Sequence, residues 1–256
     1  MTIMLPSIEK SPDTATLELV ARQRTLYEGP EIDSMLDHLI RETPHPTLSP
    51  CDIQQLLRSS RALYFDCHVE VVSGHHTGIY LRFESIARFP DLITRIASNM
   101  AEWIVETFGH DPPTGIITTS SDARLLAQRT SDLLAMQMPL RVVLTPFDHR
   151  TGRIGTDIVQ GTISTGERFL ALNDVTTRGM CVNKLGTVVT DHGGQVAGMM
   201  VFARRDSGQF PFMAELTGTY PFYFSVDLEM PQWEPADCHL CTAKKPLFLW
   251  RDLPAW

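Results

Sequence analysis

Apolar residues in the middle of the chain switch between helical and strand spacing, in the order that an α/β protein requires. From Pro90 to Phe108 they recur every three or four residues, which predicts a helix with one buried stripe that ends at Gly109. Short apolar runs predict buried strands at 115–118, 141–145, 168–173 and 193–204, and a helix over 122–136. Strands joined by crossovers of this length predict a central parallel sheet flanked by helices.

The flanking regions have a different character. The first fifty residues are polar and interrupted by proline, with helical spacing at 32–40 and a capped helix after Ser49. Short strands are predicted at 62–65, 68–72 and 80–83, and 148–155 is predicted to be a long polar loop. The segment after Asp206 is rich in aromatic residues and proline, and we expect it to fold back on the core.

Composition narrows the functional classes. The 22 basic and 30 acidic residues give a net charge of −8 without a basic tract, so an extended nucleic-acid surface is not expected. No apolar run approaches the ~20 residues of a membrane span, so no membrane association is expected. The five cysteines are an odd number in a chain of ordinary globular composition, which favours a reducing, cytoplasmic location.

One strand–turn–helix segment carries the strongest chemical signal. The run 168–173 ends in Asp174, and a turn through Thr177 and Gly179 leads to a helical segment at Cys181. Backbone N–H groups at such a turn form an anion site, and the carboxylate before it is suited to a polyol or a metal. A turn without a ligand is the alternative interpretation.

This segment resembles the ribose-phosphate loop of type I phosphoribosyltransferases. A second segment, with Ser73, Gly74, Thr77 and Tyr80, resembles the N-terminal signature of orotate phosphoribosyltransferases, although His75 stands where that family has arginine. Further landmarks follow in the family's order, at 166–168, 193–198 and 238–247, the last resembling the Cys-x-x-Cys ending of a bacterial branch.

The resemblance implies a type I phosphoribosyltransferase fold with a hood over the central parallel sheet, usually as a homodimer. Along the chain it implies four parts: a helical extension (1–60), the hood and first helix (61–110), the core (111–208) and a tail on core or hood (209–256). It implies a Mg²⁺-dependent transferase of pyrimidine nucleotide biosynthesis. The enzyme would move the 5-phosphoribosyl group of phosphoribosyl pyrophosphate (PRPP) to orotate or a related heterocyclic base.

The site residues are likewise implied by the resemblance. Asp174, His149 and Arg150 are the expected catalytic residues, with Asp174 also contacting Mg²⁺ in part through the substrate. Ser73, Gly74, His75 and Tyr80 are expected at the base. The residues expected to bind PRPP are Asn173, Asp174, Thr177, Arg178, Gly179, Cys181, Thr119, Ser120 and Arg153.

Three departures from the family pattern keep an alternative open. Asn173 replaces the first of two adjacent acids, 118–122 lacks the usual glycines, and 148–153 carries arginines without lysine. A non-catalytic sensor of PRPP or a nucleotide, or a partner subunit of a related chain, would also fit these changes.

Cys238 and Cys241 have the spacing of half a zinc site. Two packed thiols in a turn are the preferred interpretation, and zinc binding and a redox pair are the alternatives. Further ligands would have to come from His239, Cys51, Cys67 or Cys181. A metal site at His75–His76 is disfavoured, because adjacent side chains of an extended chain point in opposite directions.

Overall fold

A six-stranded sheet forms the centre of the molecule in the computed structural model, which describes residues 13–205 and 210–255. Its strand order is β1-β12-β11-β10-β6-β7. Neighbouring strands from β12 to β7 are parallel, and β1 is antiparallel at one edge. The strands are β1 (Ile40–Glu42), β6 (Gly115–Thr119), β7 (Arg141–Thr145), β10 (Arg168–Thr176), β11 (Gln195–Arg205) and β12 (Phe222–Leu228). The predicted mostly parallel α/β architecture is confirmed.

The predicted central helices are also present. The helix α5 spans Pro90–Phe108, with proline at its start and glycine after its last residue. The helix α6 (Ala123–Leu134) lies between β6 and β7, as predicted from 122–136. Local signals were sufficient here, because an apolar stripe at helical spacing predicts a helix without reference to the rest of the chain.

Two local predictions were wrong. The predicted strand at 80–83 is the two-residue β5 (Tyr80–Leu81), and Phe83 begins the short helix α4 (Phe83–Ala87). The polar loop at 148–155 contains a small hairpin of β8 (Phe147–Asp148) and β9 (Arg153–Ile154). Gly152 makes the tight turn between them at φ 69°, a conformation that glycine adopts without strain.

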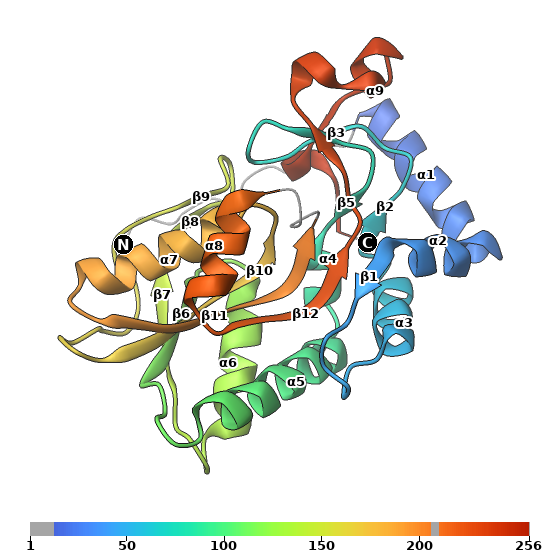
Figure 1. Cartoon of the computed structure of the whole chain (residues 1–256). Helices are drawn as coiled ribbons and strands as arrows, with labels where there is room; N and C mark the ends of the chain where they lie inside the picture. The colour runs from blue at the N-terminus through green and yellow to red at the C-terminus, as the bar shows by residue number, and fades with distance from the viewer. Residues whose placement is uncertain (1–12, 206–209, 256) are drawn as a thin grey trace, which may run out of the picture.

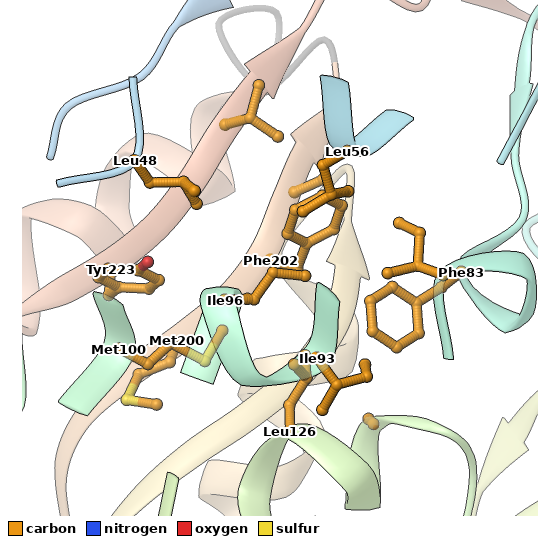
Figure 2. Close-up of a cluster of buried hydrophobic side chains, with 14 of the residues drawn as sticks. Leu48, Leu56, Phe83, Ile93, Ile96, Met100, Leu126, Met200, Phe202 and Tyr223 are labelled. Atoms are coloured by element: carbon orange, nitrogen blue, oxygen red, sulfur yellow. The ribbon is translucent and has the colours of Figure 1, made fainter. Parts of the chain in front are cut away.

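Both faces of the sheet are buried, as alternate residues of the strands show. Leu170 and Leu172 pack toward α5 and α6, whereas Phe169 and Ala171 pack toward α7 (Met180–Asp191) and α8 (Pro211–Thr219). Figure 1 shows α5 and α6 below the sheet and α7 and α8 above it. Figure 2 shows Ile96 of α5 among buried side chains of the sheet, which include Met200 and Phe202 of β11 and Tyr223 of β12. Burial on both faces explains why these strands are apolar runs rather than alternating ones.

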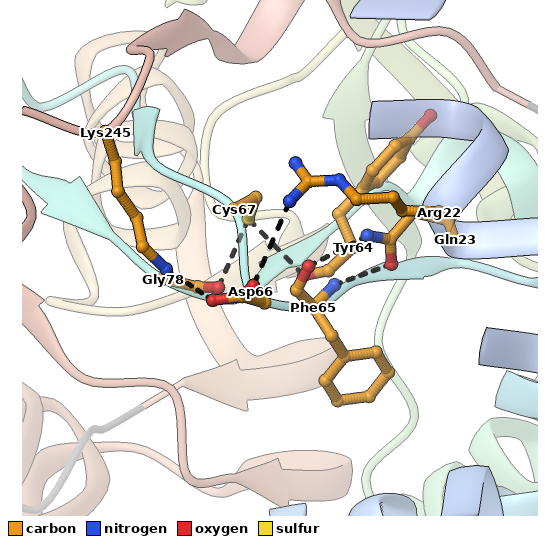
Figure 3. Close-up of polar contacts among 8 residues, drawn as sticks. All are labelled: Arg22, Gln23, Tyr64, Phe65, Asp66, Cys67, Gly78 and Lys245. Atoms are coloured by element: carbon orange, nitrogen blue, oxygen red, sulfur yellow. Dashed lines mark hydrogen bonds and ion pairs between the residues drawn. The ribbon is translucent and has the colours of Figure 1, made fainter. Parts of the chain in front are cut away.

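Three N-terminal helices precede the hood: α1 (Thr14–Glu28), α2 (Glu31–Leu39) and α3 (Pro50–Ser60), and the buried side chains of α2 and α3 join the same core cluster as those of α5. The predicted cap of α3 is a reciprocal capping box between Ser49 and Asp52. On α1, the buried Gln23 donates to the carbonyl of Phe65 at 2.8 Å and accepts from its N–H at 2.9 Å (Figure 3). The amide of Gln23 therefore satisfies both backbone groups of Phe65, as a neighbouring strand would, where the chain enters the hood.

The hood is interleaved with the end of the chain. A four-stranded sheet has the order β13-β4-β3-β14 and combines β3 (Val69–Glu70) and β4 (His76–Thr77) with β13 (Gln232–Trp233) and β14 (Phe248–Leu249). Between β13 and β14 lie the turn η2 (Pro235–Asp237) and the short helix α9 (His239–Thr242), and η3 (Trp250–Asp252) follows β14. A strand pair of β2 (Leu63–Tyr64) and β5 completes this region.

The last part of the chain thus contributes to both sheets, because β12 lies in the central sheet while β13 and β14 join the hood. The division into four parts stays a prediction, and residues 1–12 of its first part lie outside the described residues. In the described ranges, no helix combines the length and apolar character that crossing a bilayer requires.

Candidate active site

A cavity of about 680 Å³ opens where β10 and β11 end, beneath the hood. Its walls come from five places: the ends of these strands, the turn after β10 with the start of α7, the start of α6, the hairpin β8–β9, and the hood with the segment after β14. Open parallel sheets bind ligands beyond the carboxyl ends of their strands, and this cavity has that position. Among its lining residues are Ser73, Tyr80, Asp122, His149, Asn173, Asp174, Thr177, Arg178 and Cys181.

Asp174 stands at the floor of the cavity near the end of β10. Its Oδ1 accepts a hydrogen bond from the N–H of Val175 at 2.8 Å. Burial raises the pKa of Asp174 to about 6, and the nearby carboxylate of Asp122 acts in the same direction. The pKa of Asp122 is also raised by burial. Two carboxylates in one cavity favour the approach of a cation or of hydroxyl donors.

The turn after β10 leads directly into the N-terminus of α7. Gly179 is the residue before the helix, with φ 79°, and no side chain caps the first turn. Helix N–H groups that lack a capping side chain are available to an anion. The methyl groups of Leu216 leave no room beside Gly179, because an added Cβ would lie 2.5 Å from Leu216 Cδ1. The left-handed backbone conformation at this turn therefore depends on glycine.

Cationic side chains line the cavity around these carboxylates. Arg178 and Arg205 each have a buried Nε without a hydrogen-bond partner among the described residues. Such donors are costly to leave unpaired in a protein interior. Lys184 on α7 and Arg251 after β14 add positive charge at the wall. This donor set is suited to an anionic ligand with several oxygens.

The hood side of the cavity presents Ser73 and Tyr80. His75 lies just outside the lining, where its Nε2 contacts Arg178 Nη2 and lies 2.6 Å from Glu234 Oε1. His75 thus connects the hood to the turn after β10. Gly74, at φ 82°, forms the tip of the loop between β3 and β4.

Several predicted site residues lie near the cavity without lining it. Thr119 is fully buried and hydrogen-bonded to Ser121 Oγ at 2.7 Å, and Ser120 Oγ accepts from the N–H of Phe147 at 3.0 Å. Arg150 and Arg153 lie on the hairpin, exposed to solvent beside His149. The hydroxyl group that lines the cavity at this loop belongs to Ser121.

Other lining residues were not predicted. Arg82, Lys184, Arg205, Trp250 and Arg251 all reach the cavity, from four separate parts of the chain. Arg205 is the residue at the end of β11, and the predicted parallel strand would have indicated that position. The other four had no local signal, because only the folded chain brings the hood, α7 and the C-terminal segment to one place.

The candidate ligands that the sequence offered for the Cys-x-x-Cys pair are not the residues that lie beside it. The described residues place Cys238 and Cys241 beside His68 and His76, with all four ligand atoms within 4.8 Å of one another. His239, Cys51, Cys67 and Cys181 are not part of this cluster. The two histidines come from the start of β3 and from β4, and antiparallel pairing of these strands brings them together.

Comparison with known proteins supports this assignment of the fold. No family model matches the chain. It is 24% identical over 199 residues to an orotate phosphoribosyltransferase of Heliobacterium modesticaldum, covering 78% of this chain and 96% of the relative. It is 27% identical over 197 residues to that of Thermus thermophilus, covering 77% and 98%.

Two solved structures share the fold. The orotate phosphoribosyltransferase of Mycobacterium tuberculosis in complex with inorganic phosphate superposes with a TM-score of 0.50 at 16% identity, over 70% of this chain and 96% of that one. The UMP synthase of Leishmania donovani gives a TM-score of 0.51 at 15% identity, over 86% of this chain and 41% of that one. The resemblance found in the sequence is confirmed: the chain is a diverged relative of the orotate phosphoribosyltransferases, built on the type I phosphoribosyltransferase fold.

Proposed function

We propose that the protein transfers the 5-phosphoribosyl group of PRPP to a ring nitrogen of orotate or a related heterocyclic base in this cavity. The observation that carries the proposal is that Asp174 lines one cavity with the uncapped N-terminus of α7 and with Arg178 and Arg205, whose Nε donors have no partner among the described residues. A sugar phosphate with a second phosphate group offers hydroxyls to the carboxylate and oxygens to the donors. The two curated relatives described above are named orotate phosphoribosyltransferases, which is this class of reaction.

The 5-phosphate is assigned to the turn after β10. The N–H groups of Thr177 and Arg178 and of the first turn of α7 supply donors there, and the positive end of the helix, which begins after Gly179, favours the charge. Arg178 adds a guanidinium that is held over the ring of Phe210 at 4.8 Å. Cys181 and Asn173 line the same wall. Burial raises the pKa of the Cys181 thiol, so it contributes as a neutral packing group.

Asp174 is assigned to the ribose hydroxyls. Once ionised, its carboxylate also stabilises the positive charge that develops on the ribose ring as pyrophosphate departs from C1. Mg²⁺ fits this site, because Asp174 and Asp122 supply oxygen atoms to the cavity and Mg²⁺ otherwise relies on phosphate oxygens and water. When bound, the ion would screen the charge of the pyrophosphate leaving group.

Pyrophosphate is assigned to the loop after β6 and to the hairpin. Ser121 lines the cavity beside Thr119 and Ser120, and His149 lines it from the hairpin, where Arg150 and Arg153 lie next to it. A closing motion of the hairpin would bring these cations over the leaving group. Lys184 supplies the ammonium group that the hairpin lacks.

The base is assigned to the hood, where Ser73 and Tyr80 line the cavity and Gly74 and His75 complete the loop. The base nitrogen attacks C1 of the ribose, the bond from C1 to the pyrophosphate oxygen breaks, and the proton of that nitrogen leaves to solvent or to a basic group. With His75 in place of an arginine, the acceptor need not be orotate itself.

One observation favours non-catalytic binding of PRPP or a nucleotide as a second function. Asp122 lines the cavity at the start of α6, where its carboxylate would oppose the additional negative charge that develops on pyrophosphate as it leaves C1. A protein that binds PRPP without turnover, alone or as a partner subunit, is the outcome that this carboxylate would produce.

Calorimetric titration with PRPP and Mg²⁺, followed by an assay of pyrophosphate release with orotate and other bases, tests the proposal. The wild type and the surface control Asp191→Asn should bind PRPP, whereas Asp174→Asn should bind at least about tenfold more weakly. Binding without pyrophosphate release from any base would establish the second function. A wild type that does not bind PRPP would refute the transferase and the non-catalytic binding of PRPP.

The resemblance further supports a homodimer in the cytoplasm. Sedimentation equilibrium of the purified chain tests the dimer, and a monomer at micromolar concentration would contradict it.

A further inference from the structure

The geometry points to a structural zinc site of the Cys₂His₂ type, formed by His68, His76, Cys238 and Cys241. These residues are separate from the cavity lining, so the site is independent of the proposed transferase activity. Figure 1 shows its location, where α9 lies above β3 at the top of the molecule.

Four of the six distances between the ligand atoms are close to those around a tetrahedral zinc ion. Zinc–nitrogen bonds of about 2.0–2.1 Å and zinc–sulfur bonds of about 2.3 Å place neighbouring ligand atoms about 3.3–3.8 Å apart. Here His68 Nε2 lies 3.0 Å from His76 Nδ1 and 3.5 Å and 3.6 Å from the sulfur atoms of Cys238 and Cys241. The Cys241 sulfur lies 3.2 Å from His76 Nδ1.

The hydrogen bonding of His68 leaves its Nε2, which faces the cluster, free to bind a metal. Its Nδ1 lies 3.0 Å from the carbonyl oxygen of Lys245, which can only accept, so Nδ1 carries the proton. The lone pair of Nε2 therefore points into the cluster. A backbone carbonyl on the second nitrogen is the usual support of a zinc-bound histidine.

Burial makes an empty cluster unfavourable. His68, His76 and Cys238 are 2%, 4% and 1% exposed. The single lone pair of His68 Nε2 faces three neighbours within 3.6 Å, and one hydrogen bond cannot satisfy all of them. A cation at the centre satisfies all four groups at once, and two thiolates with two imidazoles form a zinc-selective set.

The fold brings these ligands together from distant parts of the chain. Pairing of β3 with β4 sets Glu70 opposite His76 and brings His68 beside them, while β13 and β14 hold the Cys-x-x-Cys segment above the same sheet. Nearby, Lys245 forms an ion pair with Asp66 at 2.5 Å (Figure 3). The metal would thus join the hood to the end of the chain, in the way a crosslink across a long loop does.

With four protein ligands the site has no open coordination position, so its role is structural rather than catalytic. It would hold two parts of the cavity wall. His76 adjoins His75, which contacts Arg178 and Glu234, and β14 leads into Trp250 and Arg251, which line the cavity. Loss of the metal is therefore expected to loosen the base-binding side of the cavity.

Metal analysis of the full-length protein, purified under reducing conditions after growth with zinc, is the first test. We expect about one zinc ion per chain. Replacement of zinc by Co²⁺ should give the thiolate-to-cobalt and tetrahedral ligand-field absorption bands of a two-thiolate site. These spectra use the wild type, so they do not depend on a variant that folds.

Variants then identify the ligands. Cys241→Ser and His76→Ala should lose the metal, whereas His239→Asn and Cys51→Ser, which lie outside the cluster, should retain it. Far-ultraviolet circular dichroism reports whether each variant folds. A reduced wild type that neither contains zinc nor binds Co²⁺ would overturn the proposal. So would a wild type in which Cys238 and Cys241 form a disulfide in place of binding a metal.

Discussion

His75 and His76 are adjacent in the chain, yet their imidazoles belong to two different sites. His75 Nε2 lies 2.6 Å from Glu234 Oε1 at the rim of the cavity, while His76 Nδ1 lies 3.2 Å from Cys241 Sγ in the Cys₂His₂ cluster. Successive side chains of an extended strand point to opposite sides, which explains how two neighbours reach different partners. Any change in the position of this strand would affect both sites together.

Asp174→Asn should stabilise the folded protein while it weakens PRPP binding. Burial raises the pKa of Asp174 to about 6. In the unfolded chain the pKa is about 3.9, so between these values the native state keeps a proton that the unfolded state has lost. The stability that Asp174 contributes is therefore present below about pH 4 and is lost as the pH rises through 6.

Asparagine does not titrate, so the variant should be more stable than the wild type, by about 2 kcal/mol at pH 8. The difference should narrow by about 1 kcal/mol at pH 5, as measured by urea unfolding at both pH values. Asp191→Asn, at the exposed end of α7, is the control. A stability difference that does not depend on pH would contradict the assigned cause.

Lys184→Ala should weaken PRPP binding without unfolding the protein. Lys184 lines the cavity from α7, and its ammonium group is of the same kind as those of the lysines that the hairpin lacks. Loss of one charged contact to phosphate corresponds to about tenfold in Kd. Calorimetry at two salt concentrations measures the effect, with Arg24→Ala on the exposed face of α1 as control. Equal affinity in both variants would exclude Lys184 from the ligand site.

Gln23→Leu should destabilise the protein by about 2–3 kcal/mol, because it leaves the N–H and the carbonyl of Phe65 buried without partners. Leucine has nearly the same volume, so packing is largely retained. Denaturant unfolding measures the cost, and Gln55→Leu on the exposed face of α3 should cost much less. Similar values for the two would show that the Phe65 contact does not support the hood.

Gly179→Ala should cost about 1–3 kcal/mol and impair PRPP binding, because φ 79° disfavours alanine and the new methyl group would meet Leu216. Gly218→Ala is the matched control. Gly218 lies in α8, with no atom within 4 Å of an added Cβ, so alanine there should be neutral or slightly stabilising. Thermal unfolding and calorimetry compare the two. A tolerated Gly179→Ala would show that the turn does not need a left-handed residue.

The sequence by itself determined the elements whose signals are local. Helix α5 has its stripe, its proline and its glycine within one segment, and Asp174 near the end of β10 lies within six residues of Gly179 in the turn that follows. The order of such landmarks was enough to indicate the fold family and the floor of the cavity.

Only the tertiary structure decided what depends on distant contacts. It placed Phe222–Leu228 in the central sheet, Lys184 and Arg251 in one cavity wall, and His68 and His76 beside Cys238 and Cys241. None of these residues carries a local pattern that points to its partner. Their proximity follows from strand pairing and packing between segments far apart in the chain, which spacing along the sequence does not encode.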